Sequence, residues 1–185
     1  MAQLIIYACP VGPLEQQIKS YLEKAQARYG RNAAHAYMPH CTLTGFFEDE
    51  VSAIPDYVDK LNVSFDEYRD RIPSPSIKIK QLTFNPNWHG LALEADWLKQ
   101  IVADFAGRSH SLTRSQSLRL KDWLHLSLAY EFKPDHAAGL TQLAKELIDV
   151  SSAVSWELRF YEQRLAKEPA PSSATTWKCH GSWAL

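Results

Sequence analysis

The sequence predicts an α+β fold, and three observations support this prediction. Segments with the apolar spacing of helices alternate along the chain with short apolar runs typical of strands. Two strand-like runs, residues 76–84 and 88–94, are separated only by the turn signal Asn85-Pro86-Asn87, as in a hairpin. The 185 residues, of which 45% are hydrophobic, suffice for one domain with a substantial core. Helices packed on antiparallel sheets are the architecture that fits this mixture.

The first half of the chain contains two predicted strands and two predicted helices. Residues 3–9 form an apolar run that predicts a buried strand. Apolar side chains recur at helical spacing over residues 14–25 and predict a helix, with a glycine after its end. Residues 40–47 are again strand-like. A second helix is expected to begin at Pro55, because proline is well tolerated at the first helical position, and its apolar stripe covers residues 58–68.

The second half continues the alternation after the predicted hairpin. Residues 97–105 have the spacing of a short helix, and residues 123–131 are strand-like. Pro134 is expected to open the last helix. Strands near residues 153–164 and 175–184 complete the prediction.

Two polar segments are expected to be exposed loops. Residues 166–174 contain two prolines and two serines. Residues 108–122 are locally basic and precede the strand that begins near residue 123. This basic loop is either ordinary solvated surface or a guide for an anionic substrate.

Charge and cysteine content exclude several classes of protein. The 20 basic and 21 acidic residues give a net charge of −1, which argues against a broad nucleic-acid binder and a polybasic membrane binder. No run approaches the ~20 apolar residues that a membrane-spanning helix needs. The cysteines Cys9, Cys41 and Cys179 are too few and too scattered for a disulfide framework. We therefore expect a soluble cytoplasmic protein, with a monomer favoured although the sequence leaves the oligomeric state open.

Two predicted strands carry the same pattern of histidine, any residue, hydroxyl residue and apolar residue. The two imidazole–hydroxyl pairs are His40 with Thr42 and His125 with Ser127. Because side chains alternate between the faces of a strand, each pair shares one face, with its members ~6.6 Å apart along the strand. The residues between them point the opposite way and are expected to anchor the strand to a core. On this basis Cys41 is predicted to be a core residue and not a nucleophile.

Such pairs are chemically suited to a phosphate group. The hydroxyl can donate a hydrogen bond to a phosphate oxygen, and the imidazole can donate one or transfer a proton near pH 7. Two pairs around one phosphorus would supply the acid and the base that hydrolysis of a phosphodiester requires, without a metal. The alternative is that both histidines are hydrogen-bonded strand residues with no catalytic role. A zinc site including Cys179 and His180 lacks the usual ligand spacing, so no metal or cofactor is expected.

The sequences PHCTLTGFF and LHLSLAY around these pairs resemble the paired His-x-Thr/Ser motifs of the 2H phosphoesterase superfamily. Within it, the resemblance extends to the 2H domain of the TULA proteins, the cyclic phosphodiesterases and the LigT-type RNA 2′,3′-cyclic phosphodiesterases. The resemblance implies a single domain, residues 1–185, of two interleaved pseudo-symmetric lobes. Their antiparallel sheets would face a central cleft, with helices on the outside. The second motif has Ser127 where threonine is commoner, and both side chains carry a hydroxyl.

The resemblance also implies an activity and roles for the four motif residues. It implies metal-independent hydrolysis of 2′,3′-cyclic nucleotides or RNA 2′,3′-cyclic phosphate ends. His40 and His125 would be the catalytic pair, and Thr42 and Ser127 would bind the phosphate. The sequence does not assign which histidine is the acid.

Alternatives and further contacts stay open at this point. The alternative functions are a phosphodiesterase for 2′,5′-linked or 3′-end oligonucleotides and a nucleotide-binding module without turnover. A nucleotide or short RNA end is expected as substrate in preference to a long nucleic acid. The candidate substrate contacts are Tyr37, Phe47, Tyr130, Arg119 and Trp177. Strand alternation places Phe47 and Tyr130 away from the histidine face unless a bulge turns them.

Overall fold

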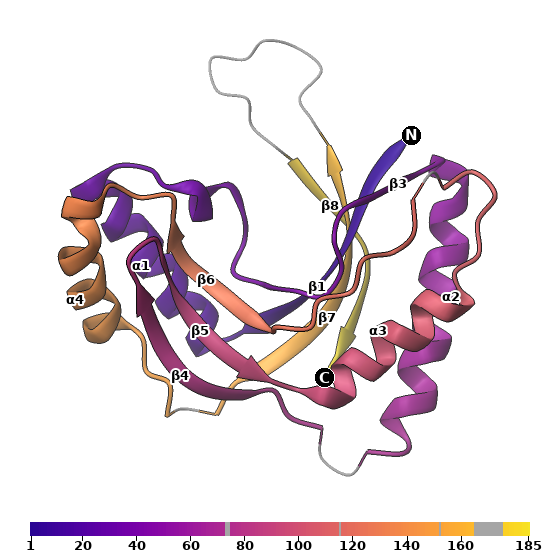
Figure 1. Ribbon diagram of the computed structural model, residues 1–185. Helices are drawn as coiled ribbons and strands as arrows, with labels where there is room; N and C mark the ends of the chain where they lie inside the picture. The colour runs from indigo at the N-terminus through magenta and orange to yellow at the C-terminus, as the bar shows by residue number, and fades with distance from the viewer. Residues whose placement is uncertain (73–74, 115, 152, 165–175) are drawn as a thin grey trace.

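One antiparallel sheet of eight strands organises the computed structural model, which describes residues 1–72, 75–114, 116–151, 153–164 and 176–185 (Figure 1). The strand order is β4-β5-β6-β2-β1-β7-β8, and β3 pairs with β1 outside this path. The strands are β1 (Ala2–Val11), β2 (Cys41–Thr42), β3 (Phe47–Asp49), β4 (Lys78–Asn85), β5 (Trp88–Glu94), β6 (His125–Tyr130), β7 (Ser155–Arg164) and β8 (Thr176–Ala184). The α+β class predicted from the sequence is confirmed. The loop predicted over residues 166–174 lies outside the described residues.

Four α-helices pack in two pairs at opposite ends of the sheet (Figure 1). They are α1 (Pro13–Tyr29), α2 (Ile54–Arg69), α3 (Asp96–Arg108) and α4 (Ala137–Leu147), joined by the short 3₁₀ helices η1 (Ala33–Ala36), η2 (Val51–Ala53) and η3 (Pro134–His136). Helix α1 contacts α4, and α2 contacts α3. Proline lies at the start of α1, α2 and η3, and Gly30 follows α1 with a φ of +81° that favours glycine. Among the described residues, no helix combines the length and apolarity needed to cross a bilayer.

The two-residue strand β2 joins the two halves of the sheet. It pairs with β1 at Thr42 and Cys41, and with β6 only where Cys41 lies across from Leu126. The two sheets expected from the sequence are therefore two halves of one sheet, β4-β5-β6 and β1-β7-β8, which meet at this narrow connection.

The strand predicted over residues 40–47 is divided into β2 and β3. Between them, the chain pairs with the end of the basic loop. The Lys121 N–H donates to the Leu43 carbonyl at 3.0 Å, and the Gly45 N–H donates to the Arg119 carbonyl at 2.7 Å. Hydrogen bonds to residues 119–121, far along the sequence, thus divide the strand predicted over residues 40–47.

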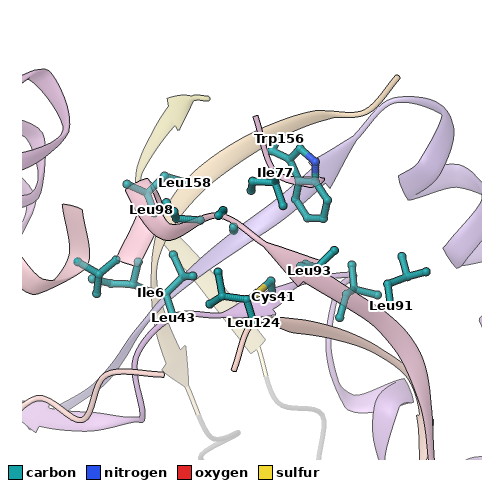
Figure 2. Packing of buried hydrophobic residues seen from close by; sticks show 14 of the residues in the cluster. Ile6, Cys41, Leu43, Ile77, Leu91, Leu93, Leu98, Leu124, Trp156 and Leu158 are labelled. Atoms are coloured by element: carbon teal, nitrogen blue, oxygen red, sulfur yellow. The ribbon is translucent and has the colours of Figure 1, made fainter. Parts of the chain in front are cut away.

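All four helices cover the same face of the sheet. The side chains of Leu4, Ile6 and Ala8 on β1 point to that face and belong to one core with residues of all four helices. Cys41, only 1% exposed, lies in this core beside strand and helix side chains, as predicted (Figure 2). The alternate β1 residue Tyr7 points to the opposite face, in a smaller cluster with Tyr161. The main core thus lies on one face of the sheet, and the pocket described below lies on the other.

A β-bulge in β6 changes which side chains share the pocket face. His89 of β5 pairs with Ala129, but the next residue, Gly90, pairs with Ser127, so Leu128 is an extra residue in β6. Leu128 and Ala129 are both completely buried in the core. The bulge consequently turns Tyr130 to the same face as Ser127.

We predict that Gly90→Ala destabilises the protein. A Cβ at Gly90 would lie 2.3 Å from the Leu126 carbonyl oxygen and 2.4 Å from Cζ2 of Trp88. Because the backbone oxygen cannot move away easily, urea denaturation should show a free energy of unfolding lower by about 1–3 kcal/mol. The control is Gly107→Ala in α3, where nothing lies within 4 Å of the added Cβ and stability should be kept or slightly raised. Equal stability of the two variants would contradict the packing described here.

Candidate active site

A pocket of about 350 Å³ on the sheet face to which Tyr7 points brings together all four motif side chains: His40, Thr42, His125 and Ser127. Its walls come from β1, β2, β5 and β6, from α1 and the segment that follows it, and from the end of the basic loop. This volume lies within the range of pockets that bind small molecules.

The pairing of β2 with β6 arranges these side chains as a two-by-two square. Because Cys41 lies across from Leu126 in antiparallel register, His40 is set across from Ser127 and Thr42 across from His125. Residues facing each other on neighbouring antiparallel strands have Cα atoms ~4.5–5.5 Å apart. Each imidazole is therefore next to a hydroxyl on its own strand and a hydroxyl on the other strand, with approximate twofold symmetry.

Both imidazoles are held by the same backbone contact. Nδ1 of His40 lies 2.8 Å from the Met38 carbonyl oxygen, and Nδ1 of His125 lies 3.2 Å from that of Trp123. A carbonyl oxygen can only accept, so each Nδ1 must carry the hydrogen. In the neutral form, Nε2 of each ring then keeps its lone pair and can accept a proton.

Aromatic rings hold each imidazole from two sides. The His40 ring centroid lies 4.0 Å from that of Tyr7 and 5.4 Å from that of Tyr37. The His125 ring stacks on Trp123, with centroids 3.9 Å apart and an interplanar angle of 22°, and its centroid lies 5.4 Å from that of Trp88 at an interplanar angle of 85°. These contacts restrict ring rotation. The face of Trp123 also favours a positive charge on His125.

The environment lowers the pKa of both histidines. Burial lowers the pKa of His40 to about 4, against the contrary effect of its hydrogen bond to Met38, and the charge of His125 lowers it further. Burial also lowers the pKa of His125, again opposed by its hydrogen bond to Trp123, and the charge of Lys121 adds to the lowering. His40 is thus the ring more strongly held in its neutral form.

The two hydroxyls are available to a ligand. Indole Nε1 of Trp88 donates to the Ser127 oxygen at 2.9 Å, so the Ser127 hydrogen remains free to be donated. The Thr42 hydroxyl has no hydrogen-bond partner among the described residues. Both can therefore donate to an oxygen placed between the strands.

The charged side chains that line the pocket are all basic. Within the described part of the chain, its lining includes Arg119 and Lys121 but no aspartate or glutamate. Neither of these two cations forms an ion pair with a described carboxylate. The protein as a whole carries a net charge of −1, so this local excess of positive charge marks the pocket as a site for an anion.

The candidate substrate contacts are divided between pocket and core. Tyr37, Tyr130 and Arg119 line the pocket. Phe47, by contrast, is 1% exposed and packs in the core, as strand alternation requires. Trp177 does not line the pocket but packs behind its wall.

The ring of Trp177 contacts three rings of that wall: Tyr7, Tyr37 and Phe46. Tyr7, Phe46, Trp88 and Lys121 are among the pocket-lining residues that sequence reasoning did not single out. Alternation from His40 could have identified Phe46. Tyr7 and Trp88 lie on distant strands, without a local signal.

Outside the pocket, residues that could ligate a metal are dispersed. A further His-x-Ser sequence, His180-Gly181-Ser182, lies in β8, where His180 Nε2 is 2.8 Å from a Glu162 oxygen. Within the described ranges, no three histidine, cysteine or acidic side chains gather as a metal site would require.

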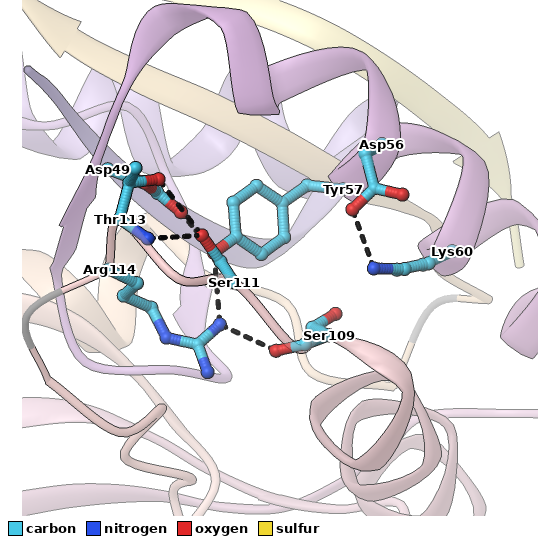
Figure 3. A network of polar contacts seen from close by, with 8 residues as sticks. All are labelled: Asp49, Asp56, Tyr57, Lys60, Ser109, Ser111, Thr113 and Arg114. Atoms are coloured by element: carbon cyan, nitrogen blue, oxygen red, sulfur yellow. Dashed lines mark hydrogen bonds and ion pairs between the residues drawn. The ribbon is translucent and has the colours of Figure 1, made fainter.

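A buried polar network anchors the basic loop to the rest of the protein (Figure 3). The Asp49 carboxylate, completely buried, accepts hydrogen bonds from the Tyr57 hydroxyl at 2.7 Å and from the Thr113 hydroxyl. The Arg114 guanidinium donates to the Tyr57 oxygen at 3.0 Å and to the Ser109 carbonyl at 2.8 Å. The loop is thus fixed before it reaches the rim of the pocket.

Together, the fold and the pocket define an α+β protein with a two-histidine site suited to an anion. No family model matches the chain. Over 157 residues it is 31% identical to "Ubiquitin-associated and SH3 domain-containing protein B" of Mus musculus and of Homo sapiens, covering 83% of this chain and 24% of each relative. Over 164 residues it is 28% identical to "Ecdysteroid-phosphate phosphatase" of Bombyx mori, covering 87% of this chain and 24% of the relative. The chain spans about a quarter of the length of the curated relatives it matches.

We predict that Asp49→Asn changes the acid stability of the protein. Burial alone would raise the Asp49 pKa, but hydrogen bonds, from Ser111, Thr113 and Tyr57 among others, outweigh it and lower the pKa to about 2. Because this pKa is below that of an unfolded aspartate, ionised Asp49 stabilises the folded protein above about pH 4. This contribution to the free energy of unfolding is lost as the pH falls towards 2. Its size is of order 2 kcal/mol.

Urea denaturation between pH 2 and 7 measures this difference. Asp49→Asn should lower the free energy of unfolding at pH 7 and flatten its decline between pH 4 and 2. The control is Asp56→Asn, because Asp56 forms only an exposed ion pair with Lys60, worth less than ~1 kcal/mol (Figure 3). A steep acid decline retained in Asp49→Asn would show that another group is responsible.

Proposed function

We propose that this chain is a phosphodiesterase of the 2H phosphoesterase type that hydrolyses 2′,3′-cyclic nucleotides or RNA 2′,3′-cyclic phosphate ends without a metal. The observation that carries the proposal is the square of two imidazoles and two hydroxyls in a pocket whose charged lining is basic. The relative from Bombyx mori is named as a phosphatase of an ecdysteroid phosphate, which supports phosphoester chemistry in general. The paired motifs support the cyclic substrate.

The difference between the two histidine environments favours distinct roles. His40, with its pKa of about 4, is neutral over most of the pH range, so its Nε2 serves as the base. His125 is more accessible and stacks on Trp123, which stabilises a protonated ring. We assign it as the acid. A bound phosphate would further stabilise the protonated ring through its negative charge.

In the proposed reaction, water attacks the phosphorus while Nε2 of His40 takes its proton. The bond from phosphorus to one ribose oxygen breaks on the opposite side, and His125 donates its Nε2 proton to that oxygen. Thr42 and Ser127 donate hydrogen bonds to the non-bridging oxygens, where charge develops. Lys121, close enough to His125 to lower its pKa, adds positive charge on that side.

A substrate panel tests the proposal. We predict that the protein hydrolyses 2′,3′-cyclic nucleotides with EDTA present, and that His40→Ala and His125→Ala each lower kcat by about 10²-fold or more, the usual contribution of an acid–base group. The matched control is His110→Ala, because this exposed histidine does not line the pocket. The panel also contains 2′,5′-linked and 3′-end oligonucleotides. Turnover of those alone would favour the rival phosphodiesterase, and binding without any turnover would favour a nucleotide-binding module.

The pH dependence gives a second test. Activity requires neutral His40, which protonates near pH 4, and protonated His125, which loses its proton below the ordinary histidine pKa of 6.5. We therefore predict a bell-shaped profile of kcat/KM with its maximum between about pH 4 and 6.5. A value of kcat/KM that still rises above pH 7 would contradict these assignments.

A further inference from the structure

The guanidinium of Arg119 occupies a place on the pocket wall that the proposed hydrolysis does not require. The backbone of its segment is fixed, because Leu120 bridges Thr44 and the flanking hydrogen bonds join Arg119 to Gly45 and Lys121 to Leu43. The side chain is exposed while lining the pocket. It is thus a solvent-accessible cation on an anchored strand segment.

Gly45 provides the space for this guanidinium. A Cβ added at Gly45 would lie 3.0 Å from Nη2, 3.1 Å from Nε and 3.3 Å from Cζ of Arg119. Three atoms of the planar group at similar distances mean that it lies across the Gly45 backbone. A Cβ at this position would displace the guanidinium by a few tenths of an ångström, so the glycine allows the group to lie this close to the backbone.

The charge of Arg119 is not neutralised by the protein. Arg108, Arg159 and Arg164 each pair with a carboxylate at 2.9 Å or less. Arg119 has no such partner among the described residues. Its planar fork of donors matches phosphate oxygens, which arginine binds in a bidentate manner.

Arg119 and Lys121 are separated along the pocket rim. Lys121 lines the pocket, and its charge lowers the pKa of His125, so this cation lies on the His125 side of the pocket. Lys121 is joined to Leu43, the residue after Thr42, whereas Arg119 lies against Gly45, two residues farther along that segment. Arg119 is therefore placed farther from the square of motif side chains. The pocket thus offers one cation to the reacting phosphate and a second cation farther along.

We propose that Arg119, positioned by Gly45, binds a second phosphate of the substrate, attached to the ribose 5′ oxygen. The preferred class would then be nucleotides that carry both a 2′,3′-cyclic phosphate and a 5′-phosphoryl group. Such a group is present in a 5′-monophosphate and in the last internucleotide linkage of an RNA end. This inference rests on the proposed function and names its substrate more closely.

The first test compares kcat/KM for adenosine 2′,3′-cyclic phosphate, its 5′-phosphorylated form and a dinucleotide ending in a 2′,3′-cyclic phosphate. A 5′-phosphoryl group should raise kcat/KM by about tenfold or more, mainly through KM, as expected for a hydrogen bond between charged groups. Arg119→Gln should bring this ratio close to one, and Gly45→Ala should reduce it. Arg28→Gln removes the same charge from an exposed site on α1 and should keep the ratio. A stronger effect for the dinucleotide than for the monophosphate would identify the RNA end as the source of the second phosphate.

A second measurement separates this inference from the proposed function. Calorimetry with adenosine 2′-monophosphate and adenosine 2′,5′-bisphosphate reports binding without turnover. Tighter binding of the bisphosphate than of the monophosphate, lost in Arg119→Gln, supports the inference. This holds even if no cyclic substrate is hydrolysed. Absence of hydrolysis would overturn the proposed function and leave the inference standing. Equal kcat/KM values with and without the 5′-phosphoryl group, or a ratio that survives in Arg119→Gln, would overturn the inference while leaving the hydrolysis intact.

Discussion

The site depends on the pairing of β2 with β6, which is only one residue pair long. Cys41 and Leu126 lie across from each other, both almost completely buried in the core under the helices. Because side chains alternate, this one register places both histidines and both hydroxyls on the opposite face. A slip of one residue would turn one strand's histidine into the core, so the packing of Cys41 protects the geometry of the pocket.

The electrostatics of the pocket follow from the same arrangement. Burial lowers the pKa of both imidazoles, most strongly that of His40, and the charge of Lys121 adds to the lowering at His125. The pocket lining in the described part of the chain contains no carboxylate to offset this. The positive charge of the pocket thus comes from Arg119 and Lys121, which form no ion pair with a described carboxylate and are available to an incoming anion. The buried Asp49 carboxylate is used elsewhere, to tie down the loop whose far end carries Arg119 and Lys121. The residues that line the pocket are thus different from the Asp49 network that anchors the loop.

Much of this arrangement follows from local patterns in the sequence. Alternation predicts the shared face of each imidazole–hydroxyl pair, and proline and periodicity predict the helices. Contacts between distant segments could not be predicted in this way. The strand over residues 40–47 is interrupted by pairing with the basic loop, and Tyr130 reaches the pocket because of the bulge in β6 opposite His89 and Gly90. Tyr7 and Trp88 reach their histidines only through the strand order of the sheet.

The central claim is that both imidazoles act on one phosphate. A crystal structure of the protein with adenosine 2′-monophosphate, a product analogue, tests it most directly. The account predicts a single phosphate within hydrogen-bond distance of Nε2 of His40 and Nε2 of His125, with the hydroxyls of Thr42 and Ser127 donating to its oxygens. A phosphate held by only one histidine, or bound away from the square that β2 and β6 form, would contradict it.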